Sequence, residues 1–280
     1  MPLEDEFPDI VKKARTGQGL SLEACAAACK VPVPVLQSLE SGRIVPTRAQ
    51  AEDIARVLHL SPQPLVDIAA GTWHPRPSTT PHIETVLGDI DGYPVKGYVL
   101  YDEGEAVFVD TAYRAVAMLE TLTHLGARLT AVCLTHGHAD HADGLDAILK
   151  VWPVPVYLGP EDERLLAWHP PRSLLRQPID GDFLQVGRQR LRFMTTPGHT
   201  PGGTCYLVET LDPLVCFVGD TVFAGSIGRS NPSSLYPAHL ESVRRRVLAL
   251  PPSTVLLPGH GPATTVAEEI EHNPFAGGRT

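Results

Sequence analysis

The stretch THGHADH, residues 135–141, places three histidines and an aspartate within six positions, directly after an apolar run. Imidazole nitrogens suit zinc or iron, and a carboxylate adds a hard oxygen ligand. On a loop that leaves a strand, the H-x-H-x-D-H spacing can turn two side chains toward one ion and two toward another. The stretch therefore predicts part of a metal centre, made by His136, His138, Asp140 and His141.

Three further ligand candidates stand in the same local setting, at or just after strand-like runs. His199 lies in TTPGHTPGG, Asp220 ends LVCFVGD, and His260 ends TVLLPGH. Glycine or proline flanks each of them, so the backbone can turn tightly and the side chain can reach inward. Loops at strand ends present chemistry on a rigid scaffold, so we expect these three residues to complete the centre.

The bulk composition bounds the class of protein. The chain has 280 residues, 43% hydrophobic and 20% charged, which is typical of a globular protein with one sizeable core. No stretch approaches the roughly 18 consecutive apolar residues of a membrane span, and the acidic start MPLEDEF is unlike a signal peptide. Five scattered cysteines fit a reducing compartment. We expect a cytoplasmic protein without a membrane partner.

The sequence pattern predicts two domains joined by a linker. Residues 1–70 contain short helical patterns, and Thr47 with Gln50 makes a capping box before an apolar stripe. Residues 71–80, GTWHPRPSTT, are rich in proline and small polar residues, as linkers are. In residues 81–280, strand-like runs alternate with helical runs such as AVAMLETLTHLG. This alternation predicts a layered α/β domain.

The larger domain resembles the metallo-β-lactamase superfamily over residues 82–275. THGHADH, PGHTPGG, GDTVF and PGHGP appear in the order of that family, and Asp110 in FVDTA matches an upstream aspartate at a strand end. The resemblance implies a four-layer αββα sandwich with a metal centre on one edge. It implies that Asp220 bridges two divalent metals, and that the other ligands are His136, His138 and His199 for the first metal and Asp140, His141 and His260 for the second. We expect Asp110 to hydrogen-bond a metal ligand, or to be a structural hydrogen-bond acceptor, rather than to bind a metal itself.

The stretches GDTVFAGSIGRS, GHGPATT and HNPF resemble the glyoxalase II group, the hydroxyacylglutathione hydrolases. That resemblance implies a thioesterase that uses a metal-bridging hydroxide, with Asp140 and Asp220 as the catalytic carboxylates. The expected metal is zinc, with iron or manganese as alternatives. A thiol with a pKa near about 8.5 leaves readily as thiolate, so the reaction requires no strong general acid.

Two departures from the glyoxalase II pattern leave the substrate open among thioesters, other esters and lactones. The chain ends soon after HNPF, where the eukaryotic type has a helical extension that grips glutathione, and Asn231 replaces the acid of the usual GRTD. Arg229 is retained. It either anchors a substrate carboxylate or makes a structural salt bridge.

A persulfide dioxygenase of the same fold is the nearest alternative. Such enzymes hold one iron through residues that correspond to His136, His199 and Asp220, and the chain has all three. The stretch GDTVFAGSIGR resembles that group less than it resembles glyoxalase II. Bound metal separates the two hypotheses.

A regulator that binds DNA is the alternative from another class. The stretch GLSLEACAAACKVPVPVLQSLESGRIVPT, followed by IARVLHLSPQPL, resembles the helix-turn-helix domain of the Cro/repressor type. However, the chain has a net charge of -9, and PVLQSLESG, the expected recognition helix, has no Lys or Arg. DNA contact relies on those residues. We therefore expect this domain to serve packing, homodimerisation or covering of the active site rather than DNA binding.

Overall fold

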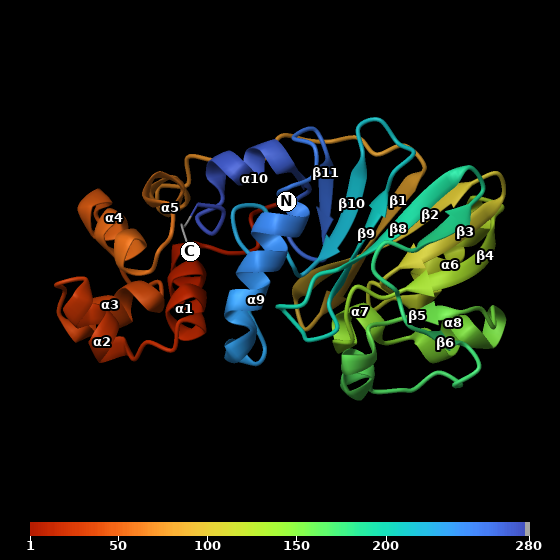
Figure 1. Cartoon of the computed structure of the whole chain (residues 1–280), viewed down its shortest axis with the longest axis horizontal. Coiled ribbons are helices and arrows are strands. Elements are labelled where there is room, and N and C mark those ends of the chain that lie inside the picture. Colours follow the sequence, from red (N-terminus) through yellow and green to blue (C-terminus); the bar gives the residue numbers. More distant parts are fainter. Residues whose placement is uncertain (278–280) are drawn as a thin grey trace.

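The computed structural model describes residues 1–277, with a helical region at one end and two packed sheets at the other (Figure 1). Ser21 caps the second helix by accepting a hydrogen bond from the Ala24 N–H, and Thr47 with Gln50 forms the predicted capping box of the fourth. The helices of this region are α1 (Phe7–Gly17), α2 (Leu22–Ala28), α3 (Val33–Glu40), α4 (Arg48–Val57) and α5 (Pro62–Ala69).

Two six-stranded sheets follow the helical region. The first has the order β1 (Ile83–Ile90), β2 (Tyr93–Asp102), β3 (Glu105–Val109), β4 (Arg128–Cys133), β5 (Val156–Tyr157) and β6 (Leu175–Arg176). The second has the order β12 (Thr264–Thr265), β11 (Val255–Pro258), β10 (Val215–Gly219), β9 (Thr204–Val208), β8 (Gln189–Thr195) and β7 (Phe183–Val186).

Helices connect the strands and cover the sheets. They are α6 (Ala115–His124), α7 (Ala139–Ala142), α8 (Leu145–Val151), η1 (Pro160–Leu165), η2 (Ser233–Leu235), α9 (Tyr236–Glu241), η3 (Ser242–Val247) and α10 (Val266–His272). Helix α9 continues without a break into η3, a π-helical segment. Within residues 1–277, no helix combines the length and the apolar character that crossing a membrane requires.

Side chains alternate along the strands between two cores, because successive residues of a strand point to opposite faces. Tyr98 lies between the sheets, where it meets Tyr206 and Phe217. Its neighbour Val99 and Phe108 of β3 point outward, toward the layer formed by α6 and α8. The helical layers and the two sheets together make the four-layer sandwich that the sequence predicted.

A single apolar core joins the helical region to the second sheet. Phe7 and Ile10 of α1 and Ile68 of α5 are buried in one cluster with Leu207 of β9 and Val218 of β10. The helical region therefore packs against α9, η3 and α10, which lie between it and the second sheet (Figure 1). The predicted domain boundaries stay a prediction, because this shared core crosses them.

Parallel pairing brings several loops to one edge of the molecule. β3 and β4 run parallel with Val109 opposite Cys133, and β10 and β11 run parallel with Gly219 opposite Pro258. β9 is antiparallel to β10, so the loop between β8 and β9 opens at the same edge. The predicted ligands follow the ends of these strands.

Candidate metal centre

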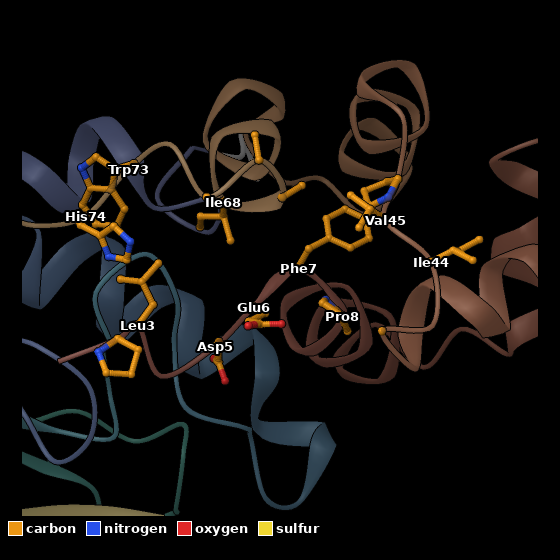
Figure 2. A pocket seen from close by; sticks show the side chains of 16 residues that line it. Leu3, Asp5, Glu6, Phe7, Pro8, Ile44, Val45, Ile68, Trp73 and His74 are labelled. Atoms are coloured by element: carbon orange, nitrogen blue, oxygen red, sulfur yellow. The ribbon is translucent and has the colours of Figure 1, made fainter.

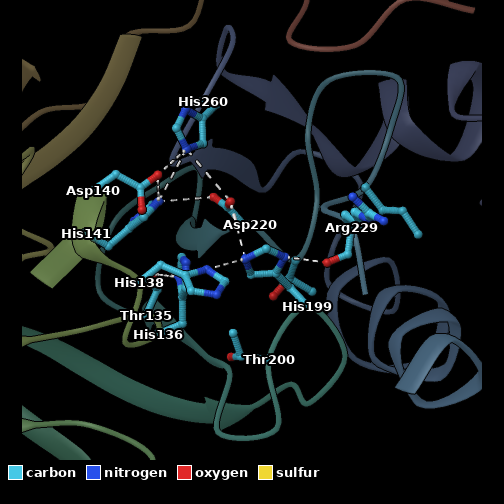
Figure 3. A network of polar contacts seen from close by, with 12 residues as sticks. Thr135, His136, His138, Asp140, His141, His199, Thr200, Asp220, Arg229 and His260 are labelled. Carbon is cyan, nitrogen blue, oxygen red and sulfur yellow. Dashed lines mark hydrogen bonds and ion pairs between the residues drawn. The ribbon is translucent and has the colours of Figure 1, made fainter. Parts of the chain in front are cut away.

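The structure gathers all seven predicted ligands at this edge (Figure 3). They come from four segments that are distant in the sequence. The segments are the loop after β4 with α7 (His136, His138, Asp140 and His141), the β8–β9 loop (His199), the end of β10 (Asp220) and the loop after β11 (His260).

Three histidines form the first group of donors. The ligand atoms of His136, His138 and His199 lie within 4.8 Å of one another, and Nε2 of His199 is 3.0 Å from Nδ1 of His138. Donor nitrogens bound to a tetrahedral zinc ion at about 2.0–2.1 Å are themselves roughly 3.4 Å apart. Nε2 of His136 is buried and has no hydrogen-bond partner. Because buried polar atoms normally have a partner, this orphaned nitrogen fits a metal ligand.

The second group contains Asp140, His141 and His260. Nε2 of His260 lies 3.2 Å from Oδ2 of Asp140 and 3.4 Å from Nε2 of His141. The three donor atoms are within 4.8 Å of one another, as in the first group. One carboxylate with two imidazoles is a donor set that suits zinc or iron.

Asp220 lies between the two groups. Its Oδ1 is 3.3 Å from Nε2 of His141, and its Oδ2 is 3.6 Å from Nε2 of His199 and 3.8 Å from Nε2 of His260. The side chain is buried, and Oδ1 makes no hydrogen bond. This is where a bridging carboxylate must lie, so the position supports the predicted role of Asp220, which stays a prediction.

Hydrogen bonds at the Nδ1 atoms of two histidines orient their rings. Oδ2 of Asp110 lies 2.8 Å from Nδ1 of His141, and the same carboxylate accepts the Thr135 N–H at 2.7 Å and the Thr135 hydroxyl at 2.8 Å. Nδ1 of His199 is 2.8 Å from the Arg229 carbonyl oxygen. An acceptor at Nδ1 keeps the proton there and leaves Nε2 free to bind a metal. Asp110 thus contacts a predicted ligand and lies outside the donor groups, and its supporting role stays a prediction.

Asp162 links the two ligand loops and is a residue that sequence reasoning missed. It is fully buried at the start of η1. Its Oδ2 accepts the Thr200 hydroxyl at 2.6 Å and the Gly137 N–H at 3.3 Å, and its Oδ1 accepts the Gly202 N–H at 2.8 Å. Gly137 lies between two ligands of the first group, and Thr200 follows the third. The local stretch GPEDE looks like an exposed acidic turn, so only the fold reveals this contact.

Burial and charge divide the histidines into two kinds. Burial holds the pKa of His136 well below its usual range and lowers the pKa of His199 to about 4, so both rings are neutral. Burial would also lower the pKa of His260, but Asp220 and the hydrogen bond to Asp140 raise it to about 9. The carboxylates therefore attract positive charge to this end of the site, and a divalent cation can supply it by displacing protons.

Gly259 allows the loop after β11 to approach the centre. A Cβ at this position would lie 2.3 Å from Cε1 of His141 and 2.7 Å from Oδ1 of Asp220. No side chain fits in that space. The glycine of PGHGP is thus required by the close approach of two predicted ligands.

A cavity of about 490 Å³ opens beside the first group of donors. Its lining residues are Thr16, His138, His199, Arg229, Ser230, Asn231 and Ser233. Arg229 is exposed, and none of the salt bridges within residues 1–277 involves it. This arrangement favours the substrate-anchoring hypothesis for Arg229 over the structural salt bridge.

A second groove, of about 420 Å³, lies on the helical region (Figure 2). The N-terminal segment, the loop after α3, the end of α5 and the following chain line it, with Leu3, Phe7, Val45, Ile68 and Trp73 among the side chains. None of its lining residues is a predicted metal ligand, so this groove is separate from the metal centre.

Comparison with known proteins finds similar proteins for both parts of the chain. Residues 11–65 match the model of a helix-turn-helix family, which confirms the predicted helix-turn-helix-like region. A Bacillus subtilis protein named a probable metallo-hydrolase, YqgX, is 33% identical over 199 residues, 65% of this chain and 92% of its own length. The hydroxyacylglutathione hydrolase GloC of Haemophilus influenzae is 27% identical over 189 residues, 62% of this chain and 88% of its own length.

Solved structures share the sandwich. BLEG-1 B3 metallo-β-lactamase superposes with a TM-score of 0.61 and 29% identity over 69% of this chain and 99% of its own. TTHA1623 in a di-iron-bound form gives 0.57 and 29% over the same shares. ETHE1 from Myxococcus xanthus gives 0.59 and 26% over 69% of this chain and 84% of its own.

The family follows from the match to the larger part of the chain. The model of the metallo-β-lactamase superfamily covers residues 90–260, which include every predicted ligand. The fold comparisons agree with that match, and so does the relative named a metallo-hydrolase. The chain is a metallo-hydrolase of the metallo-β-lactamase superfamily.

Proposed function

We propose that the protein hydrolyses thioesters at a centre of two divalent metal ions, with glutathione thioesters as the first substrates. The observation that carries the proposal is the pair of donor groups on either side of Asp220. A single ion does not need both groups. The likeness to GloC, a hydroxyacylglutathione hydrolase, supports the thioester bond as the one that is cleaved.

The two donor groups divide the metals between them. His136, His138 and His199 would hold the first ion, Asp140, His141 and His260 the second, and Asp220 would contact both. Zinc is the first choice for this set of five imidazoles and two carboxylates, with iron or manganese as alternatives. When bound, such ions supply a Lewis acid and an activated water at neutral pH.

The two carboxylates of the centre differ in burial, and we give them different roles. Asp220 is the more buried carboxylate, and His260 and His141 hold its pKa well below its usual range against the opposing effect of burial. Asp140 has a side chain that is 22% exposed and lies 3.2 Å from Nε2 of His260. We assign Asp220 to positioning at the reacting centre, and Asp140 to passing a proton to solvent.

The cavity beside the first donor group suits a polar, anionic thiol. Arg229 offers a guanidinium that makes no salt bridge with any of residues 1–277 and can bind a carboxylate through two hydrogen bonds. Ser230 and Asn231 add a hydroxyl and an amide to the same wall. Glutathione, which carries two carboxylates, fits this chemistry.

A persulfide dioxygenase that holds one iron is the second candidate, because the structure brings together the three ligands that it would need. Such a centre would use His136, His199 and Asp220. It leaves the complete second group, Asp140, His141 and His260, without a role. That group is the reason we place the hydrolase first.

Two assays on one preparation test the proposal. The protein is purified without added metal and then given S-lactoylglutathione or glutathione persulfide in parallel, with metal-free protein as the control. Thiol release from the thioester, without oxygen uptake on the persulfide, supports the hydrolase. Oxygen uptake without thiol release contradicts it and favours the dioxygenase. Neither activity, with metal bound, directs the search to lactones and other esters.

A further inference from the structure

We propose that α1 of the helical region forms one wall of the substrate cavity, and that Thr16 on this wall determines which thiols the site accepts. The inference rests on the proposed function, because it concerns the thiol part of the substrate. It assigns the helix-turn-helix-like region a role inside the active site.

The first observation is the lining of the cavity. Thr16 lines it together with His138 and His199, two ligands of the first donor group, and with Ser233 at the start of η2. The Thr16 hydroxyl donates to the Lys12 carbonyl oxygen at 2.7 Å, within its own helix. The wall thus offers the cavity a small side chain whose hydroxyl proton is already used.

The second observation is an anchor that holds α1 against the loop carrying Arg229. Asp5 is buried just before the helix and accepts the Ser226 hydroxyl at 2.5 Å. Lys13 donates to the same carboxylate and, at 2.9 Å, to the Ile227 carbonyl oxygen. Ser226 and Ile227 precede Arg229 in the chain, so both walls of the cavity are tied together by these bonds.

The third observation is close packing at the end of α1. A Cβ at Gly17 would lie 2.4 Å from the ring of Tyr236, the first residue of α9. Phe7 and Ile10, earlier in the helix, are buried in the same apolar core as Tyr236. Closely packed elements cannot shift to relieve an added side chain without cost. The wall is therefore rigid, and the residue at position 16 sets the width of the cavity.

The chemistry of the cavity indicates the class of ligand that the wall selects. A volume of about 490 Å³ lies within the range of sites for ligands of moderate size. Arg229 favours a thiol that carries a carboxylate. A small uncharged thiol would reach the metals without touching either wall, and a thiol as large as glutathione would contact Thr16.

The experiment fills the cavity in the full-length, cobalt-loaded protein. Thr16→Trp is compared with Ala27→Trp, which adds the same side chain to an exposed position of α2. The probes are glutathione and 2-mercaptoethanol, and the readout is the thiolate-to-cobalt absorption band, which needs no turnover. We expect Thr16→Trp to weaken glutathione at least about tenfold and to change 2-mercaptoethanol by less than about twofold. Ala27→Trp should leave both affinities unchanged.

Two results overturn the inference. One is an unchanged affinity of Thr16→Trp for glutathione. The other is an equal loss for both thiols, since that would place the damage at the metals and not at the wall. Thr16→Ser, which should bind glutathione like the wild type, checks that volume is the cause. A wild type that binds glutathione and fails to cleave its thioesters contradicts the proposed function alone, and the comparison of variants still tests the wall.

Discussion

The metal centre and the helical region relate to their sequences in different ways. At the centre, the residues that predict the fold are the same residues that meet in space, for example His136, His199 and Asp220. In the helical region, the helix-turn-helix pattern matches residues 11–65, and nothing in that pattern indicates that Thr16, at the end of α1, lines the cavity beside the centre. The local sequence of a ligand motif thus indicates its chemistry. The function of a fold motif depends instead on the surface against which it packs.

The recognition helix, which contacts the bases in helix-turn-helix proteins that bind DNA, is a second case in which the fold does not determine the chemistry. We expect that helix to be α3, which exposes Pro34 and Gln37 and contains no Lys or Arg. Lys30 and Arg43 only flank it. The helix-turn-helix fold is present, but its expected recognition helix lacks the basic side chains that bind DNA phosphates.

Removing the central carboxylate should have the largest effect. We expect Asp220→Ala to retain about one metal ion or fewer per chain and to lose measurable turnover, because both donor groups lose their shared ligand. Metal analysis and thioester hydrolysis on one sample measure both losses. A variant with full metal content and full turnover would refute the assignment of Asp220.

Removing the charge of Asp162, which links the two ligand loops, should have the second largest effect. Asp162→Asn keeps the shape of the side chain but removes the charge that accepts three hydrogen bonds. We expect metal affinity or turnover to fall by about 10- to 100-fold, as for other residues that orient ligands. Glu161→Gln, at the exposed neighbour, is the matched control. Equal behaviour of the two variants would remove Asp162 from the site.

Removing the ion pair that anchors α1 should have a smaller effect, which is a loss of stability. Lys13→Met leaves Asp5 buried with its ion-pair partner removed, so the free energy of unfolding should fall by about 3 kcal/mol. Urea unfolding measures the change. Lys12→Met, on the exposed side of the same helix, is the control. Asp5→Asn added to Lys13→Met should recover part of the loss; a further loss would mean that the pair is not the cause.

A substitution in the expected recognition helix should have the smallest effect, because we expect only weak DNA binding. At about 150 mM salt we expect genomic DNA fragments to bind no more tightly than about 10 µM, in the range of non-specific contacts. Gln37→Ala should leave that value unchanged. A salt-dependent shift at nanomolar protein that Gln37→Ala abolishes would give the helical region a second role and reverse our interpretation of it.

Much of the fold follows from local sequence signals. Residues such as Thr47 and Gln50 mark a helix start through their own backbone contacts, and the apolar runs mark the central strands. β5, β6 and β12 have two residues each, too few to show a period. Thr16 and Asp162 could not be predicted as site residues, because neither belongs to a ligand motif and the site residues that each lies beside are at least 25 positions away. Their roles depend on how distant elements pack.

The stoichiometry of activation tests the central claim most directly. Metal-free protein is titrated with zinc, and hydrolysis of a glutathione thioester is followed at each addition. The two donor groups around Asp220 predict that activity rises until two equivalents are bound and then stays constant. A plateau at one equivalent, or activity that does not depend on metal, would contradict a centre of two metals.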